Sequence, residues 1–448
     1  MKYILFIIIV AQIYAKLPAK TSVQVVKQFK QAEFKEVQNV RKQSDGDIIL
    51  GIEMSGHYLP LLKNKRVAVV VNQTSVFPLR KTNTLFLDKI EPKRDDFNSN
   101  HSNFKFAGAG THLVDTLLSL NIRIEKIFSP EHGFRGKTEA GASVESGIDS
   151  AAGLPVISLY GKNKKPSLQS LKNIDVVLFD LQDVGTRFYT YISTLQYVME
   201  ACAEAKIPII VLDRPNPNGY YIDGAVLDTS LRSFVGMQPI PVVHGLTIGE
   251  YALMLKGEKW IKGDVRLTVI PMKQYNRNRI YPLAVSPSPN LSTMSSVLYY
   301  PSLCLFEGTA VSVGRGTQIP FMCYGFPKCP IGDFAFTPVA LKGIAENPPY
   351  KDIQCRGFFL GNVKKQARRG IMIEWIIDMY NAYPDKDKFF TPFFDKLAGT
   401  KILQKQIREG KTATEIRASW QNDLEKFKIV RKKYLLYEDI TDKKWKGN

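Results

Sequence analysis

Residues 126–136, with the sequence Lys-Ile-Phe-Ser-Pro-Glu-His-Gly-Phe-Arg-Gly, place a carboxylate, an imidazole and a guanidinium directly after a hydrophobic run. Residues 122–128 are predicted to form a strand, and the proline that follows disfavours a helix at the residue before it. We therefore expect Glu131, His132 and Arg135 on a loop at the carboxyl end of a strand, the edge at which open α/β sheets bind ligands. A surface turn with solvated charges is the alternative interpretation of this stretch alone.

The same pattern of a hydrophobic run followed by polar residues recurs along the chain. Strands are predicted at residues 66–72, 122–128, 154–159, 174–179 and 207–212, and helices at 111–120 and 189–205. Runs without polar alternation, separated by helices, are typical of parallel strands buried on both faces. The fold class predicted for residues 46–288 is therefore α/β, with a Rossmann-like, doubly wound, mainly parallel sheet. The carboxyl edge of this sheet should gather Asn72, Glu131, Asp180, Asp183, Asp213 and Asn216.

A second polar cluster lies at residues 242–250. Its pattern predicts a short strand, a turn and the start of a helix, with Thr247 as the N-cap and Glu250 as its capping-box partner. Structural capping is the favoured interpretation of Glu250, whereas His244 is expected to face a cleft.

The proline-rich segment 286–290 is predicted to form the boundary between two domains. A smaller α+β domain over residues 289–448 should complete the active-site cleft against the first domain. Glu307 and Arg315 lie in glycine-flanked loops of this second domain. Helices are also predicted at residues 370–383 and 412–427.

The first residues, 1–15, have the pattern of a secretory signal peptide. A basic start is followed by a hydrophobic core at residues 3–10 and by an acceptable small-residue cleavage site that ends at Ala15. A membrane anchor is the alternative, but the hydrophobic run is short for a membrane span. We therefore expect an exported protein, periplasmic or secreted, without stable membrane insertion. Residues 16–45 form a lysine-rich lead to which no chemistry is assigned.

Composition and motifs narrow the function classes. The net charge of +19, from 61 Lys and Arg against 42 Asp and Glu, favours polyanionic surroundings, and the absence of a nucleic-acid module argues against DNA binding. The sequence lacks the glycine-rich phosphate motifs and the G-x-S-x-G elbow, and no cofactor is expected. The five cysteines have no zinc-ligand spacing, although Cys323 and Cys329 are near enough in sequence to pair. A metal site, the less favoured alternative, would have to combine His132, His244, Asp180 and Asp213.

Several segments together resemble the NamZ-type exo-β-N-acetylmuramidases, a family of peptidoglycan glycoside hydrolases. They are Asn72-Gln-Thr, Ser129 to Gly136, Asp183 to Tyr191, Asp213-Arg-Pro-Asn-Pro217, His244-Gly-Leu-Thr, Ser288-Pro-Asn290, Leu305-Phe-Glu-Gly-Thr and Gly314-Arg-Gly-Thr317. The resemblance covers roughly residues 50–440, and the string 129–136 is its most specific part. It implies a Rossmann-like first domain, a smaller second domain and a cleft between them. It also implies the release of N-acetylmuramic acid from the non-reducing end of peptidoglycan fragments.

Glycoside hydrolysis requires a carboxylic acid at the leaving oxygen and usually a second group across the sugar ring. Glu131 is the predicted general acid, because Phe128 and Phe134 can supply an apolar wall that raises the pKa of a carboxyl group. Glu307 and Asp183 compete for this role, and Glu307 is favoured as the partner across the cleft. The predicted catalytic set is Glu131, Glu307, Asp183 and His132.

The lactyl carboxylate of muramic acid calls for an arginine fork or a helix N-terminus. We expect at least one of Arg135, Arg187 and Arg315 to bind it, and Tyr189 can stack on the sugar, with core packing as the alternative. The other residues expected to bind substrate are Asn72, Asp180, Asp213, Asn216, His244 and Asn290. Two rival functions are a non-catalytic glycan-binding protein and a metal-dependent cell-wall amidase or deacetylase.

Overall fold

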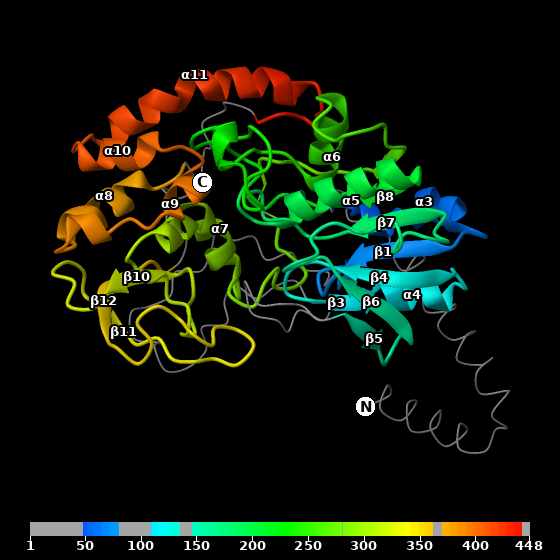
Figure 1. The fold of residues 1–448 in the computed structure, drawn as a ribbon, viewed down its shortest axis with the longest axis horizontal. Coiled ribbons are helices and arrows are strands. Elements are labelled where there is room, and N and C mark those ends of the chain that lie inside the picture. Colours follow the sequence, from blue (N-terminus) through cyan, green and yellow to red (C-terminus); the bar gives the residue numbers. More distant parts are fainter. Residues whose placement is uncertain (1–47, 80–108, 135–145, 280, 362–369, 441–448) are drawn as a thin grey trace, which may run out of the picture.

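The structure is a computed structural model that describes residues 48–79, 109–134, 146–279, 281–361 and 370–440. The predicted signal peptide at residues 1–15, the lead at 16–45 and Arg135 lie outside these described residues. Two domains are visible side by side, with the first coloured blue to green and the second yellow to orange (Figure 1).

The first domain is built on a seven-stranded sheet with the order β5-β6-β4-β1-β7-β8-β9, in which only β5 runs antiparallel to its neighbour. The strands are β1 (Val67–Val71), β4 (Ile124–Ser129), β5 (Gly147–Asp149), β6 (Leu154–Ser158), β7 (Val176–Asp180), β8 (Ile209–Leu212) and β9 (Leu267–Ile270). Taken in chain order, the parallel strands lie in the sequence 3-2-1-4-5-6, the order of a Rossmann sheet. The predicted fold class of this domain is confirmed.

Both faces of the sheet are covered, as the unbroken hydrophobic runs predict. On β1, Val67, Val69 and Val71 point into one core, whereas Ala68 and Val70 point into the other. The helices α3 (Ser55–Leu62) and α4 (Leu113–Ser119) contribute to the first core, and α5 (Tyr191–Ala205) and α6 (Ile248–Gly257) to the second. Because apolar side chains fill both faces, polar groups of the central strands are confined to the strand ends.

Some predicted boundaries differ from the observed ones. Residues 109–112, expected in part as the start of a helix, form strand β3 (Ala109–His112), which pairs with β2 (Val76–Pro78), and His112 caps α4. Val243 forms only isolated bridges, to Thr186 and Asp223. The capping box at Thr247 and Glu250 is confirmed, with the Glu250 amide donating to Thr247 Oγ1 at 3.2 Å and the Thr247 amide to Glu250 Oε2 at 2.9 Å.

The second domain combines a small antiparallel sheet with helices. Its strands lie in the order β10-β12-β11, and the domain begins near α7. The elements are α7 (Met294–Leu303), β10 (Cys323–Phe326), β11 (Phe334–Phe336), β12 (Cys355–Phe359), α8 (Ile373–Ala382), α9 (Phe394–Ala398), α10 (Ile402–Arg408) and α11 (Ala413–Lys432). All five cysteines, including Cys323 and Cys329, are unpaired.

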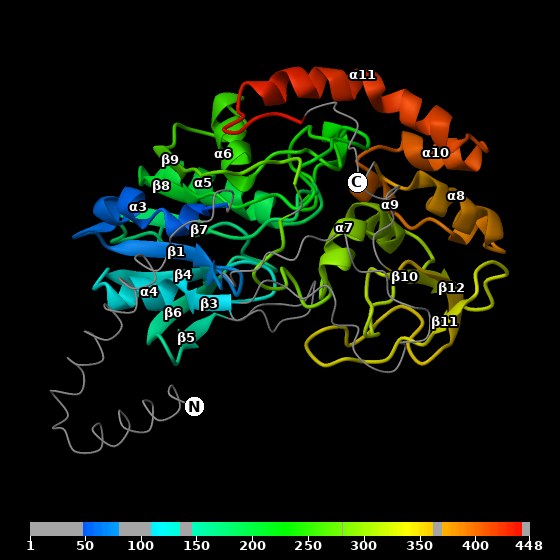
Figure 2. The same cartoon turned by 180° about the vertical axis from the view of Figure 1, so that it is seen from behind.

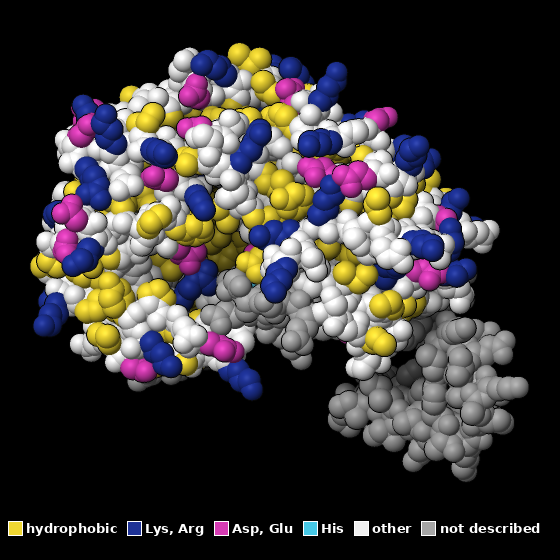
Figure 3. All heavy atoms as spheres, viewed as in Figure 1, with side chains coloured by type: hydrophobic (Ala, Val, Ile, Leu, Met, Phe, Trp, Pro, Cys, Tyr) yellow, Lys and Arg dark blue, Asp and Glu magenta, His cyan; other side chains and the backbone are white. Residues whose placement is uncertain are grey.

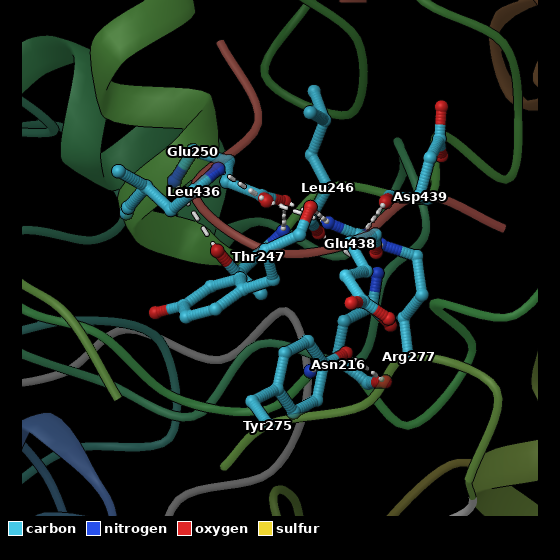
Figure 4. Close-up of polar contacts among 12 residues, drawn as sticks. Asn216, Leu246, Thr247, Glu250, Tyr275, Arg277, Leu436, Glu438 and Asp439 are labelled. Carbon is cyan, nitrogen blue, oxygen red and sulfur yellow. Dashed lines mark hydrogen bonds and ion pairs between the residues drawn. The ribbon is translucent and has the colours of Figure 1, made fainter. Parts of the chain in front are cut away.

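Helix α11 and the segment after it join the two domains. In both views α11 runs from α10 of the second domain to the neighbourhood of α6 in the first (Figures 1 and 2). Near its end, the Arg431 guanidinium donates to Gly245 O at 2.8 Å and to Asp439 Oδ1 at 2.6 Å. The chain then packs against the buried Glu250–Arg277 ion pair, where the Leu436 amide donates to Glu250 Oε1 at 3.0 Å (Figure 4).

The buried ion pair yields a prediction for stability. Glu250 Oε1 and Arg277 Nη2 lie 2.6 Å apart, and both side chains are fully buried. The Glu250→Gln variant leaves the guanidinium without a countercharge, so the free energy of unfolding should fall by about 3–5 kcal/mol in denaturant titrations. The control Glu425→Gln removes an exposed pair with Lys428 and should cost less than about 1 kcal/mol. Equal losses in the two variants would contradict the role given to the buried pair.

Candidate active site

The carboxyl ends of β4, β1 and β7 bring three predicted site residues to one edge of the sheet. Asn72 follows β1, Glu131 lies two residues after β4, and Asp180 ends β7. Strand β1 pairs with both β4 and β7. Successive strands are therefore added on one side of β1 up to β6 and on its other side from β7 onward. This is the topological switch point at which doubly wound sheets bind ligands.

Asn72 is fully buried and its hydrogen bonds are made within the protein. Its Nδ2 donates to the Tyr191 hydroxyl at 2.6 Å, and its Oδ1 accepts from the amide and hydroxyl of Thr74 at 2.9 and 2.6 Å. The hydroxyls of Tyr191 and Tyr189 in turn donate to the carbonyl of Pro287, at 3.3 and 2.7 Å. Asn72 thus positions the aromatic residues at the start of α5.

Glu131 is a partly exposed carboxylate fixed by hydroxyl groups. Thr190 Oγ1 donates to Glu131 Oε2 at 2.7 Å, and Thr190 is the N-cap residue of α5. The N-terminus of a helix favours a negative charge. Burial, together with the charge and the hydrogen bond of Glu131, raises the pKa of the Tyr160 hydroxyl. The carboxylate is therefore held from two elements, and the residue is partly exposed.

The loop around Glu131 differs from the expected hydrophobic wall. Phe128 belongs to the core on one face of the sheet and Phe134 to the core on the other, so the two rings do not enclose the carboxylate together. His132 is buried and adopts a left-handed backbone conformation with φ of 74°, followed by Gly133 at 77°. This turn lets the chain leave the strand sharply at Glu131.

A row of aromatic rings leads from this edge into the second domain. The ring centroids of Tyr191 and Tyr189 lie 4.7 Å apart, those of Tyr189 and Tyr300 5.9 Å, and those of Tyr300 and Phe321 5.1 Å. The Arg315 guanidinium then stacks on Phe321, 5.1 Å from its centroid. Figure 3 shows a recess between the two domains with hydrophobic side chains in its depth and charged ones at its rim.

Glu307 and Arg315 form an ion pair in the second domain. Arg315 Nε lies 2.5 Å from Glu307 Oε1, and both side chains are about one-fifth exposed, at 19% and 22%. Burial opposes the charge of Arg315, but the Glu307 carboxylate overcomes this effect and raises the pKa of the guanidinium. The other oxygen of Glu307 lies 3.6 Å from the Cys304 thiol.

Asp183 is a buried carboxyl group beside the tyrosines. Its Oδ2 accepts from the Gly185 amide at 2.6 Å, while its Oδ1 is buried and has no partner in the described part of the chain. Burial raises the pKa of Asp183 to about 7. The group can therefore hold a proton near neutral pH.

Several other predicted site residues are used inside the first domain. Asp180 forms a buried ion pair with Arg214, whose Nη2 lies 2.7 Å from Asp180 Oδ2. Asp213 accepts from the Gly249 amide and the Thr247 hydroxyl, each at 2.8 Å, and burial raises its pKa to about 7. These carboxylates anchor the loop after β8 and the start of α6.

Arg187 and His244 also lie in the interior. Arg187 is fully buried, and its guanidinium donates to the carbonyls of Ala225, Ile240 and Leu397 at 2.7, 2.8 and 2.9 Å, the last of which belongs to α9. His244 Nδ1 accepts from the Leu246 amide at 3.2 Å, and burial, with the charges of Arg431 and Arg187, lowers the pKa of His244 to about 3. Both residues bind protein groups where substrate contacts were predicted.

Asn216 and Asn290 bind backbone carbonyls with their amide groups. Asn216 Nδ2 donates to Leu246 O and Asn290 Nδ2 to Ile344 O, each at 2.8 Å. The structure thus brings Asn72, Glu131 and Tyr189 together at one sheet edge. The aromatic row connects this edge to Arg315 and Glu307 in the second domain.

Neither a metal centre nor a membrane helix is formed by the described residues. Among them, no group of three or more His, Cys, Asp or Glu side chains is arranged to hold a metal ion. None of the helices in the described ranges is long and apolar enough to cross a membrane.

Comparisons with known proteins place the chain in a family. The N-terminal profile of the exo-β-N-acetylmuramidase NamZ matches residues 98–295, and the C-terminal profile matches residues 298–437. The chain belongs to the NamZ family. A peptidoglycan β-N-acetylmuramidase NamZ of Bacillus subtilis strain 168 is 40% identical over 353 residues, which are 74% of this chain and 85% of the relative.

Solved structures of related proteins share the NamZ architecture. One DUF1343 family protein of Bacteroides fragilis NCTC 9343 is 44% identical with a TM-score of 0.75, and the match covers 88% of this chain and 99% of that chain. A second protein of the same family and organism is 29% identical with a TM-score of 0.69, over 88% and 100% of the two chains. The two-domain fold is therefore that of known crystal structures.

Three residues of the site were not assigned a role from the sequence. Thr190 lies in the string 183–191, which resembles the NamZ family, but a threonine that opens a helix is read as a cap. Tyr160 directly follows a predicted strand, and this position at a strand end could have marked it as a site residue. Tyr300 lies in a hydrophobic helix, and its place in the aromatic row depends on tertiary packing.

Asp183 yields a prediction for the pH dependence of stability. Because an unfolded Asp titrates near pH 4, the folded protein holds this extra proton between about pH 4 and 7. The free energy of unfolding should fall as the pH rises through this window, by up to about 1.4 kcal/mol per pH unit for this group. The Asp183→Asn variant should show a shallower fall than the wild type in urea titrations at several pH values. Asp213 is present in both proteins, so its contribution to the pH dependence cancels when the two are compared. Identical slopes of unfolding free energy against pH would therefore exclude a protonated, buried Asp183.

Proposed function

We propose that this chain is an exo-acting glycoside hydrolase that releases N-acetylmuramic acid from the non-reducing end of peptidoglycan fragments. Membership of the NamZ family supports the activity. The observation that carries the mechanism is the half-buried Glu131 carboxylate, held by Thr190 at the switch point of the sheet. Muramic-acid-terminated saccharides are the proposed substrates in cell-wall turnover.

Glu131 acts as the general acid in this proposal. Its protonated carboxyl donates a proton to the glycosidic oxygen as the bond from that oxygen to C1 of the sugar breaks. Water supplies the hydroxyl group that adds to C1, and the proton released by the water restores Glu131. The hydrogen bond from Thr190 to one carboxylate oxygen fixes the orientation of the group at the edge of the sheet.

A general-acid role predicts the effect of the Glu131→Gln variant. The substitution keeps the shape but removes the ionisable proton, so kcat on an unactivated muramic-acid-terminated disaccharide should fall by about 100- to 10,000-fold. The melting temperature and substrate binding should stay near wild type. Glu125→Gln, on strand β4 that precedes Glu131 and paired with Arg123, is the matched control and should retain activity. Near-normal turnover by Glu131→Gln would move the acid role to Glu307 or Asp183.

We also propose that the protein acts outside the cytoplasm, periplasmic or secreted. The proposal rests on the basic start, hydrophobic core and small-residue exit within residues 1–15. Peptide mapping of the mature protein should find an N-terminus near Lys16. An intact Met1 on membrane-embedded protein would contradict export with cleavage.

A further inference from the structure

We infer that Arg315, oriented by Glu307, is the residue that selects substrates with a carboxylate on the terminal sugar. This inference rests on the proposed function and names the recognition element for its substrate class. Glu307 is then a positioning residue for Arg315, in place of the cross-cleft catalytic role predicted from the sequence. The lactyl group of N-acetylmuramic acid is the carboxylate in question.

The loop that carries Arg315 is closely packed, which restricts the direction in which the side chain leaves the backbone. Gly314 and Gly316 flank it with φ of 77° and 81°. A Cβ atom at Gly314 would lie 2.5 Å from the Cys323 sulfur, and one at Gly316 would lie 2.5 Å from Val339 O. The Thr317 hydroxyl also donates to Gly314 O at 2.6 Å. Arg315 is therefore presented from a turn in which both glycines are required.

The guanidinium of Arg315 has one occupied side and one open edge. Its Nε is bound to Glu307, and its Cζ lies over the ring of Phe321, 5.1 Å from the centroid. The two terminal nitrogens make no hydrogen bond to any residue in the described ranges, and they are not among the buried atoms without a partner. The contact with Phe321 and the bond to Glu307 thus hold the group, and its two terminal nitrogens have no hydrogen-bond partner among the described residues, an arrangement that can bind a carboxylate through both oxygens.

Four buried arginines among the described residues lack this open edge. Arg187 donates to three backbone carbonyls, Arg214 is paired with Asp180, and Arg277 is paired with Glu250. Arg431 binds Asp439 and Gly245 O. Each of these side chains is at least nine-tenths buried, whereas the Arg315 side chain keeps 19% of its surface exposed.

The aromatic row connects this fork to the predicted acid. Tyr300 contacts both Phe321, on which Arg315 stacks, and Tyr189, which neighbours Tyr191. Tyr191 lies within electrostatic reach of Glu131. All four rings of the row are buried, so the row joins the two groups by packing and is not itself a surface for the sugar. Glu131 lies near its first-domain end and the cationic fork at its second-domain end, and the inference places the glycosidic bond at the first group and the lactyl carboxylate at the second.

The experiment compares three aryl β-glycosides: N-acetylmuramic acid with a free lactyl carboxylate, its lactyl methyl ester, and N-acetylglucosamine. Wild-type enzyme should prefer the free acid over the ester. In Arg315→Gln and Arg315→Lys, kcat/KM for the free acid should fall by about 10- to 100-fold, mostly through KM, while the values for the ester and for N-acetylglucosamine change by less than about 3-fold. Glu307→Gln should shift the same ratio in the same direction and leave kcat for the ester nearly unchanged. Arg356→Gln, an exposed arginine on β12 of the same domain, is the control and should behave as wild type.

Equal losses on the acid and the ester in the Arg315 variants would overturn the inference, because they would assign the arginine to folding or general catalysis. A loss of kcat on all three glycosides in Glu307→Gln would instead make Glu307 a catalytic group. Thermal unfolding of each variant separates these results from misfolding. If wild-type enzyme cleaves no muramic acid glycoside, the proposed function fails. If it cleaves the free acid and Arg315→Gln keeps its preference for it, the carboxylate inference alone fails.

Discussion

The central strands of the sheet must bury both of their faces, and this constraint decides where polar chemistry can occur. Val67 to Val71 alternate between two hydrophobic cores, and the first residue that leaves these cores is Asn72. The neighbouring strands end at the same edge, which brings Glu131 near Asn72 and the start of α5. A polar residue within the strands would lose its hydration without a partner, so the site is confined to their ends.

The site also depends on the second domain. The carbonyl of Pro287, in the segment that leads into the second domain, accepts hydrogen bonds from Tyr189 and Tyr191, and Tyr300 on α7 packs on Tyr189. Arg187 and Arg431 add buried hydrogen bonds between elements far apart in the sequence. These contacts fix the aromatic row and the Glu307–Arg315 pair relative to the sheet edge. The first domain alone therefore lacks Arg315, the group proposed to bind the carboxylate of the substrate.

The sequence allowed the sheet to be predicted because its strands are short, hydrophobic and β-branched, and the polar residues after them follow directly from the parallel topology. The individual roles could not be predicted in the same way. Asp180, Asp213 and Arg187 occupy positions typical of a ligand site, but their side chains bind Arg214, the start of α6 and backbone carbonyls, respectively. Such pairings join residues far apart in sequence, and no local spacing encodes them. Glu131 and Arg315 differ from these residues in burial, because Glu131 is half-buried and the Arg315 side chain keeps 19% of its surface exposed.

The most direct test of the central claim is the hydrolysis of two isomeric disaccharides, followed by mass analysis of the products. One carries β-linked N-acetylmuramic acid at the non-reducing end and N-acetylglucosamine at the reducing end, and the other has the reverse order. We predict that the enzyme converts the first into its two monosaccharides and leaves the second intact. Cleavage of both to the same extent, or of neither, would contradict an exo-acting muramidase.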